Sequence, residues 1–275
     1  MKTRRLILMV FALGAASSLS FGFGLGDIAA KVAEKAVTDP NAAKGFTGLT
    51  LAEEINIGDS VSVEIVGRYG GIWHNTVATQ RVNLVGRTLT RYAKRDSIDW
   101  RFGLLNSDAI NAFSAPNGRV FITKGLYKLL ENDDELAGVL AHEIAHVDLR
   151  HAAKIIAGKQ ATGAAVGLGA EIAGDELGKK YGNLPVETKA LEEAVGKAVS
   201  GLLTNGYGAD REYEADRVGY ELAKTTGFAP DGLRIALNKV EANTAQAKEV
   251  FSTHPATKDR LKKLPGGEEK KKKGK

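Results

Sequence analysis

The chain contains no cysteine, which excludes a disulfide framework and also a lipid-modified cysteine behind a leader peptide. No internal repeat is visible along its 275 residues. A chain of this length is enough for one domain with a sizeable core, with room for an added segment, and a hydrophobic content of 43% indicates a globular protein.

No apolar run is long enough to span a membrane, which takes roughly 20 residues. The unbroken apolar run Leu6–Ala16 follows a short basic start and precedes small residues, which is the order of a secretory signal peptide. We therefore predict a signal peptide in residues 1–20 and an exported, periplasmic protein. An uncleaved anchor in the inner membrane is the less favoured alternative, since serine and glycine dilute the run beyond Ala16.

The body of the chain has almost no net charge, although the formal total is +5. Lys2, Arg4 and Arg5 contribute +3 and residues 268–275 contribute another +3, which leaves −1 for everything between them. A nearly neutral body predicts no nucleic-acid partner. The basic tail, residues 266–275, is expected to be disordered and leaves proximity to a membrane surface open.

Helices and a small sheet are predicted for the first half of the domain. Apolar residues at helical spacing predict helices at Leu49–Val66 and Trp73–Ala93, and Thr50 with Glu53 resembles a capping box. Short apolar or alternating runs then predict a sheet that ends in a hairpin with its turn at Ser114–Gly118. The three strands are expected within Trp100–Asn106, Ala109–Phe113 and Arg119–Thr123.

The second half is predicted to be helical. A short helix is expected at Lys124–Leu130, and the caps and acidic residues of Glu131–Glu135 begin a longer helix that runs to about His151. Further helices are expected at Gly208–Thr226 and Asp231–Ala242. The fold class is therefore α+β and mostly helical. The expected organisation is a lead-in at 21–48, a domain at 49–265 and an insertion rich in alanine and glycine at about 152–205.

The stretch His142-Glu143-Ile144-Ala145-His146 places two histidines four residues apart. Residues i and i+4 share one face of a helix, so both imidazoles can reach one metal ion. Glu143 is rotated by about 100° from His142 and could act on a metal-bound water without being a ligand, as a general base must.

The alternative is an ordinary helix whose histidines are merely hydrogen-bonded. Leu136, Val139, Leu140 and Val147 form the apolar stripe of this helix, and Glu143 falls inside the stripe. A carboxylate there would be buried at a cost of several kcal/mol unless it is paired or faces a site. The position of Glu143 therefore favours a catalytic zinc site.

A catalytic zinc takes three protein ligands and leaves one position for water. Without cysteine and with only five histidines, few residues can be the third ligand. Glu212 and Asp216 share a helical stripe with small residues that let two helices approach closely. Glu212 could bind the metal while Asp216 accepts a hydrogen bond from the outer nitrogen of a ligand histidine. A solvated acidic face paired with Arg211 and Arg217 is the alternative, and Glu214, about 160° from Asp216, is expected to face solvent.

Four motifs together resemble those of a known family. They are NAFSAPNGRVFITKGL at Asn111–Leu126, HEIAH followed by DLRH at Asp148–His151, REYEAD at Arg211–Asp216 and STHPATKDR at Ser252–Arg260. From about Leu49 to Leu264 the chain resembles the gluzincin metallopeptidases that include CAAX prenyl protease, HtpX and BepA. We find no counterpart here of the transmembrane helices of the first two or of the repeat domain of BepA. The resemblance therefore does not extend to the intramembrane substrates of the first two or to the assembly contacts of BepA.

The resemblance implies a zincin-like metalloprotease domain with a small β-sheet beside the HEXXH helix and one Zn²⁺ ion per chain. It also implies roles for individual residues: metal ligands His142, His146 and Glu212, catalytic base Glu143, and Asp216 behind a ligand histidine.

The three other histidines receive different predictions. His151 would point away from His146 by about 140° on a regular helix, which favours a structural role. His74 has no motif around it and is expected at the surface or in the core. His254 precedes Pro255, which holds it extended, and lies in the STHP motif. The resemblance implies that it either holds charge on the substrate oxygen in the transition state or occupies the open zinc position and inhibits the enzyme, and a capping or packing role is the alternative.

An extended peptide substrate adds naturally to an exposed sheet edge. The strand at Asn111–Phe113, with Asn111 and Ala112 as binding residues, or the strand at Arg119–Thr123 is therefore the predicted substrate platform.

The sequence thus predicts an exported zinc-dependent endopeptidase. Unfolded or misassembled envelope proteins are the expected substrates, through the family resemblance. Two alternatives stay open: a peptidase that trims chain ends, for which no amine-binding motif is found, and a latent, chaperone-like binder of unfolded envelope proteins.

Overall fold

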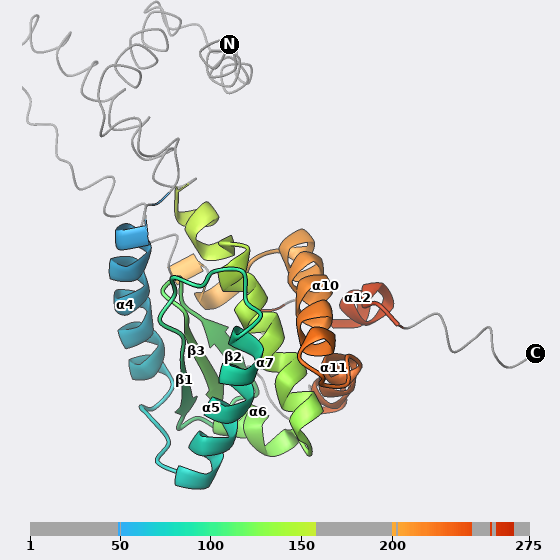
Figure 1. Cartoon of the computed structure of the whole chain (residues 1–275). Helices are drawn as coiled ribbons and strands as arrows, with labels where there is room; N and C mark the ends of the chain where they lie inside the picture. The colour runs from blue at the N-terminus through green and yellow to red at the C-terminus, as the bar shows by residue number, and fades with distance from the viewer. Residues whose placement is uncertain are drawn as a thin grey trace, which may run out of the picture. The chain divides into compact units, whose positions relative to one another are not determined.

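The computed structural model describes residues 49, 51–157, 200, 201, 203–243, 254 and 257–266 (Figure 1). The chain divides into two compact units, and the unit made of Thr50–Lys154 and Val199–Lys275 holds nearly all of these residues. The predicted signal peptide and lead-in, most of the insertion and of the basic tail, and Thr50 of the capping box lie outside the described residues. None of the helices in the described part is long and apolar enough to cross a membrane.

The two helices predicted first are present as α4 (Leu51–Arg68) and α5 (Thr76–Thr90). Helix α5 begins three residues later than predicted because the side chain of Asn75 caps it, accepting a hydrogen bond from the amide of Ala78 at 2.9 Å. Not every apolar residue of this helix is buried, since Val77 and Leu84 are 75% and 70% exposed. The buried face of α5 is instead formed by Ala78, Val82, Val85, Gly86 and Leu89.

The small sheet is confirmed, with the order β1-β3-β2. Strand β1 (Arg101–Leu105) pairs in parallel with β3 (Arg119–Thr123), and β2 (Ala112–Ser114) forms the predicted hairpin with β3. Strand β2 starts later than predicted and includes Ser114, which had been assigned to the turn. Because β3 is central, Arg119–Thr123 cannot be the substrate edge, and that alternative was wrong.

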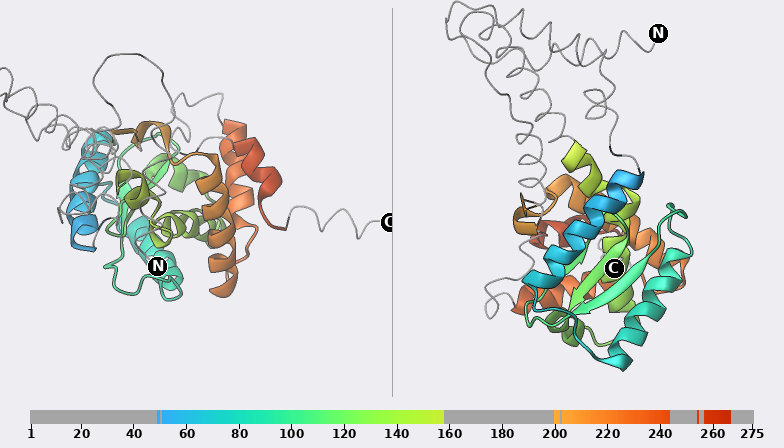
Figure 2. Two further views of the ribbon diagram at one scale, coloured as in Figure 1. Left: turned by 90° about the horizontal axis from the view of Figure 1, so that it is seen from above. Right: turned by 90° about the vertical axis from the view of Figure 1, so that its left-hand side faces the viewer.

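The two faces of the sheet pack against different helices. Phe102, Leu104, Ala112, Val120 and Ile122 join the main core with α5 and α7, whereas the alternate residues Leu105, Phe113 and Phe121 pack with Val61 and Ile65 of α4. The right-hand view of Figure 2 shows α4 (blue) alongside the strands (green). The sheet is therefore covered on both faces.

Helix α7 (Asp133–Asp148), which carries the HEIAH motif, lies at the centre of this unit. It follows α6 (Lys124–Leu129), and Asn132 caps it by accepting a hydrogen bond from the amide of Glu135 at 2.9 Å. Every residue from Glu135 to Val147 is buried, because α5, α10, α11 and β2 all contact α7. The predicted apolar stripe is present, but this helix has no solvent-facing side over that range.

Helix α7 ends at Asp148 rather than at about His151. Arg150 has a left-handed backbone with φ of 57°, which a helix cannot accommodate, and the chain is helical again from 151 to 157. Glu54 of α4 forms ion pairs with Arg150 and with Arg95, at 2.8 Å for the latter. The fully buried Glu54 therefore offers the side chain of Arg150 a partner at this unusual position.

The remaining helices are α10 (Ala209–Thr225), α11 (Gly232–Asn243) and α12 (Thr257–Lys263). The small residues predicted to allow close packing of α10 do so: a Cβ atom on Gly219 would lie 2.9 Å from the backbone nitrogen of His142. Glycine at this position lets α10 lie directly against the HEIAH segment.

Candidate metal centre

Helix α7 places His142, Glu143 and His146 in the interior, each no more than 2% exposed. One helical turn separates the two histidines, and their Nε2 atoms lie 3.0 Å apart. Two ring nitrogens at this distance point toward the same small volume, the arrangement expected from their spacing.

Helix α10 brings Glu212 to the same volume. One of its oxygens, Oε2, lies 3.4 Å from His142 Nε2, and the other, Oε1, lies 3.5 Å from His146 Nε2. Glu212 is fully buried, and although burial acts to raise the pKa of its carboxyl group, the neighbouring histidines hold that pKa well below its usual range. The carboxylate form, which can bind a metal, is therefore the stable one.

These distances fit a tetrahedral metal site. Nitrogen ligands at 2.0–2.1 Å from zinc lie about 3.3–3.4 Å apart when the geometry is tetrahedral. The three distances among His142, His146 and Glu212 are 3.0, 3.4 and 3.5 Å. The donor set, two imidazoles and one carboxylate with no sulfur, is also one that catalytic zinc uses. The residues present therefore fit zinc.

His254, just before α12, completes the group. Its Nδ1 atom lies 3.3 Å from His142 Nε2 and 3.0 Å from Glu212 Oε2, and its Nε2 atom lies 3.2 Å from Glu143 Oε1. The candidate ligand atoms of His142, His146, Glu212 and His254 all lie within 4.8 Å of one another. Burial acts to lower the pKa of His254, but Glu212 and Glu143 raise it to about 10.

Asp216 and Arg260 lie behind His142 and Glu212. Asp216 Oδ1 is 2.9 Å from His142 Nδ1, the contact expected of this acid. Arg260 donates from Nε to Asp216 Oδ2 at 2.9 Å and from Nη2 to Oδ1 at 2.6 Å, and its Nη1 lies 3.2 Å from Glu212 Oε2. Burial acts to raise the pKa of Asp216, but Arg260 and His142 lower it below the usual value. Sequence reasoning did not single out Arg260, although it ends the STHPATKDR motif; its position six residues after His254 was the available signal.

Glu143 is held by a residue of the sheet. Ser114, on β2, donates a hydrogen bond from Oγ to Glu143 Oε2 at 2.8 Å. Tyr207 stacks on the ring of His146, with centroids 4.0 Å apart and an angle of 21°, and donates to the carbonyl of Ser114 at 3.4 Å. Sequence reasoning missed both Ser114 and Tyr207, because neither lies in a metal-ligand pattern.

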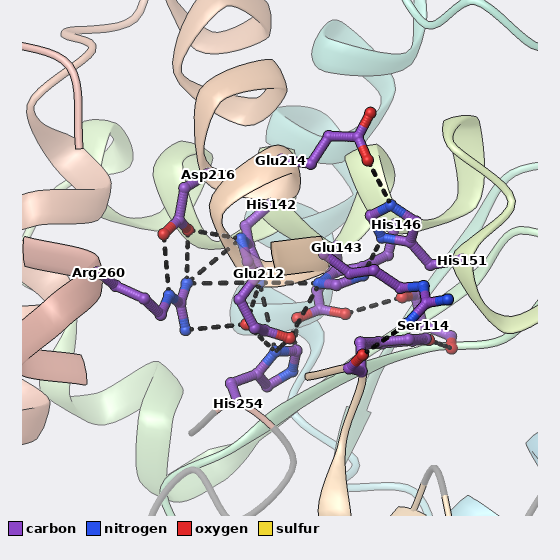
Figure 3. A network of polar contacts seen from close by, with 12 residues as sticks. Ser114, His142, Glu143, His146, His151, Glu212, Glu214, Asp216, His254 and Arg260 are labelled. Atoms are coloured by element: carbon purple, nitrogen blue, oxygen red, sulfur yellow. Dashed lines mark hydrogen bonds and ion pairs between the residues drawn. The ribbon is translucent and has the colours of Figure 1, made fainter. Parts of the chain in front are cut away.

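The structure also places His151 differently from expectation. His151 does not point away from His146: their Nδ1 atoms are 2.8 Å apart, because the chain turns at Arg150 (Figure 3). The side chain of Glu214 is 44% exposed, in agreement with its expected place toward solvent, and its Oε2 lies 3.3 Å from His151 Nε2. His74, in contrast, is exposed and lies apart from the cluster.

The two predicted substrate residues lie at the start of the edge strand. Asn111 precedes β2 and Ala112 begins it, and both are buried. The amide of Ala112 donates to the side-chain oxygen of Asn111 at 2.9 Å, and the amide of Asn111 donates to Thr123 Oγ1 at 3.1 Å. These contacts fix the backbone at the point where β2 begins.

Comparison with known proteins matches this chain to peptidases. The family model described as peptidase family M48 matches residues 77–267. The beta-barrel assembly-enhancing protease of Escherichia coli strain K12 is 28% identical over 248 residues, which cover 86% of this chain and 48% of that protein. The mitochondrial metalloendopeptidase OMA1 of Schizosaccharomyces pombe is 27% identical over 230 residues, covering 80% of this chain and 62% of that protein. The chain thus spans about half the length of the first relative.

Proposed function

The chain belongs to peptidase family M48, and from that membership we propose that it is a zinc-dependent endopeptidase that hydrolyses peptide bonds of envelope proteins. The observation that carries this proposal is the buried set of two imidazole nitrogens and one carboxylate at tetrahedral spacing, with Glu143 directly after the first ligand on α7. The names of the relatives, which describe a protease and a metalloendopeptidase, support the same type of reaction.

In this proposal His142, His146 and Glu212 hold one zinc ion per chain. When bound by these residues, zinc would supply a Lewis acid that lowers the pKa of water toward about 7 and polarises the scissile carbonyl. Asp216 accepts a hydrogen bond from His142 Nδ1 and so keeps the proton on that nitrogen, which leaves Nε2 free to act as a ligand. Arg260 compensates the buried negative charges of Asp216 and Glu212.

Glu143 is the proposed general base. Its carboxylate takes a proton from the attacking water and then passes it to the leaving amine. The hydrogen bond from Ser114 Oγ fixes the orientation of this carboxylate toward the cluster. Because Ser114 lies on β2, the base and the edge strand have a fixed position relative to each other.

The substrate is proposed to bind as an extended segment along the outer edge of β2. Strand β2 is an edge strand of the sheet and contacts α7. The side chains of Asn111 and Ala112 are buried, so these residues would contribute backbone groups to the substrate rather than side-chain contacts.

His254 is proposed to hold the resting enzyme in an inhibited state. Its Nδ1 lies 3.3 Å from His142 Nε2 and 3.0 Å from Glu212 Oε2, where it would take the ligand position that catalysis requires for water. Its Nε2 at the same time contacts the carboxylate of Glu143, the proposed base. Release of His254 would free both the ligand position and Glu143. The other role, a donor to the substrate oxygen in the transition state, predicts the opposite effect of removing the side chain.

Unfolded or misassembled envelope proteins are the proposed substrates, and the periplasm is the proposed location. Two observations support this: residues 1–20 have the layout of a secretory signal, and one relative is named a beta-barrel assembly-enhancing protease. The placement of His254 also favours a second candidate, a latent protein that binds unfolded envelope proteins with little proteolysis.

Metal analysis and casein digestion of the unchanged protein and of Glu143→Gln test the proposal. We expect one zinc per chain in both proteins and hydrolysis only in the unchanged one, because Glu143 is a base and not a ligand. Glu221→Gln, on the exposed face of α10, is the matched control and should keep both properties. Equal hydrolysis by Glu143→Gln would refute the mechanism. Zinc binding without hydrolysis by either protein would favour the latent binder.

A further inference from the structure

His151 lies beside His146 only because of the backbone of Arg150. On a continuous helix, five residues correspond to a rotation of about 140° beyond one full turn, which would separate the two side chains. The left-handed Arg150 ends α7 and turns the chain back. As a result the His146 and His151 ring centroids are 4.9 Å apart, and His151 is only 1% exposed.

A continuous series of polar contacts leads from His146 to a carboxylate on α10. His146 Nδ1 lies 2.8 Å from His151 Nδ1, and His151 Nε2 lies 3.3 Å from Glu214 Oε2 (Figure 3). Glu214 is two residues after Glu212 and therefore lies about 160° away around α10. His151 connects this carboxylate to the histidine.

The direction of the hydrogen bonds in this series follows from the chemistry of its end. A carboxylate can only accept, so His151 must donate from Nε2 to Glu214. A neutral imidazole carries one proton, which leaves Nδ1 of His151 as an acceptor. His146 must therefore donate from its Nδ1, and its Nε2 keeps the lone pair that faces His142 and Glu212. The proton that His151 Nε2 donates to Glu214 thus determines the tautomer of His146, which carries its own proton on Nδ1 and can bind a metal through Nε2.

His142 has the same arrangement without the intermediate ring, because Asp216 meets its Nδ1 directly at 2.9 Å. We propose that His151 is a positioning residue for the metal site, which links Glu214 to His146 and holds the His146 ring with Nε2 toward the ion. This inference rests on the proposed zinc site. It assigns to His151 and Glu214 the role for His146 that Asp216 has for His142.

The test compares zinc affinity, measured by competition with a chromophoric chelator, in His151→Asn and His151→Leu. The two side chains have nearly the same shape, but only asparagine carries an acceptor, at the position of the histidine Nδ1. We expect His151→Leu to bind zinc 10- to 100-fold more weakly, the usual effect of losing such a partner, and His151→Asn to stay close to the unchanged protein. His74→Leu, at an exposed histidine, is the control and should change nothing.

A second readout is the visible absorption of the cobalt(II)-substituted proteins, which responds to the geometry of the ligands. We expect the spectrum to shift in His151→Leu and to be restored in His151→Asn. Equal zinc affinity in the two variants, whether both are normal or both are weakened, would overturn this inference and leave the proposed function intact. Failure of the unchanged protein to bind zinc would overturn the proposed function and this inference together.

Discussion

Arg260 and Asp216 form a fully buried, two-point ion pair, with Nε–Oδ2 and Nη2–Oδ1 distances of 2.9 and 2.6 Å. The planar guanidinium matches the carboxylate in a way that lysine cannot. Helix α12 is thereby joined to α10 directly behind His142, and the pair supports the metal site through contacts with both proposed ligands on its side.

Removal of Arg260 should therefore destabilise the fold. In Arg260→Ala, the buried Asp216 loses its counter-charge, and breaking such a pair costs about 3–5 kcal/mol. Urea denaturation of the metal-free protein measures this cost. Arg217→Ala, at an exposed arginine of α10, should leave the free energy of unfolding nearly unchanged. A loss below about 1 kcal/mol in Arg260→Ala would contradict a structural role for the pair.

Substitution of two helical glycines should have opposite effects. In Gly219→Ala the new methyl group lies 2.9 Å from the His142 nitrogen, so α10 must move away from α7, at a cost of about 1–3 kcal/mol and with weaker zinc binding. Gly67→Ala places the same group in open space on α4 and should stabilise the fold by about 0.5–1 kcal/mol. Thermal denaturation distinguishes the two. A stabilising Gly219→Ala would show that the close approach of the helices is not required.

Glu212→Ala should lose most of its zinc, because it removes a proposed ligand, whereas Glu214→Ala should still fill its site when zinc is abundant. The two glutamates lie on different sides of α10, and only Glu212 reaches both His142 Nε2 and His146 Nε2. Metal content after dialysis against buffered zinc measures the difference. The reverse result would move the ligand assignment to Glu214.

His254→Ala should raise hydrolysis of an unfolded protein, by the inverse of the fraction of enzyme that is open at rest. The reason is that His254 contacts both the ligand cluster and Glu143. Steady-state kinetics with zinc content checked gives the answer, and Lys258→Ala, exposed on α12, is the control. A fall of about a hundredfold would instead indicate a donor to the transition state. A change within about twofold would show that His254 has no part in the activity of the site.

Features encoded by local spacing could be predicted from the sequence. The bounds of β3 were predicted to the residue, and the HEIAH segment lies on a helix with Glu143 buried, as its place in the apolar stripe required. The small-residue stripe of α10 likewise indicated close packing, which Gly219 makes possible. Each of these depends on residues within a few positions of one another.

Features that depend on distant partners could not be predicted. Arginine rarely adopts a left-handed backbone, so no local signal marked Arg150 as the end of α7, and the contact between His151 and His146 was missed with it. Arg260 lies among lysines that suggest a solvated surface, and only the fold places it beside Asp216. The sequence of β1 or of β3 alone also does not indicate that the two strands pair in parallel.

The burial of α7 on all sides has a consequence for motion. Its backbone amides can exchange with deuterium only when the helices and the sheet around it separate, which is close to global unfolding. The amides of His142 and His146 should therefore be among the slowest to exchange in the chain. Opening and closing of the site would then come from movement of the groups around α7, since the helix itself holds His142, Glu143 and His146 in place.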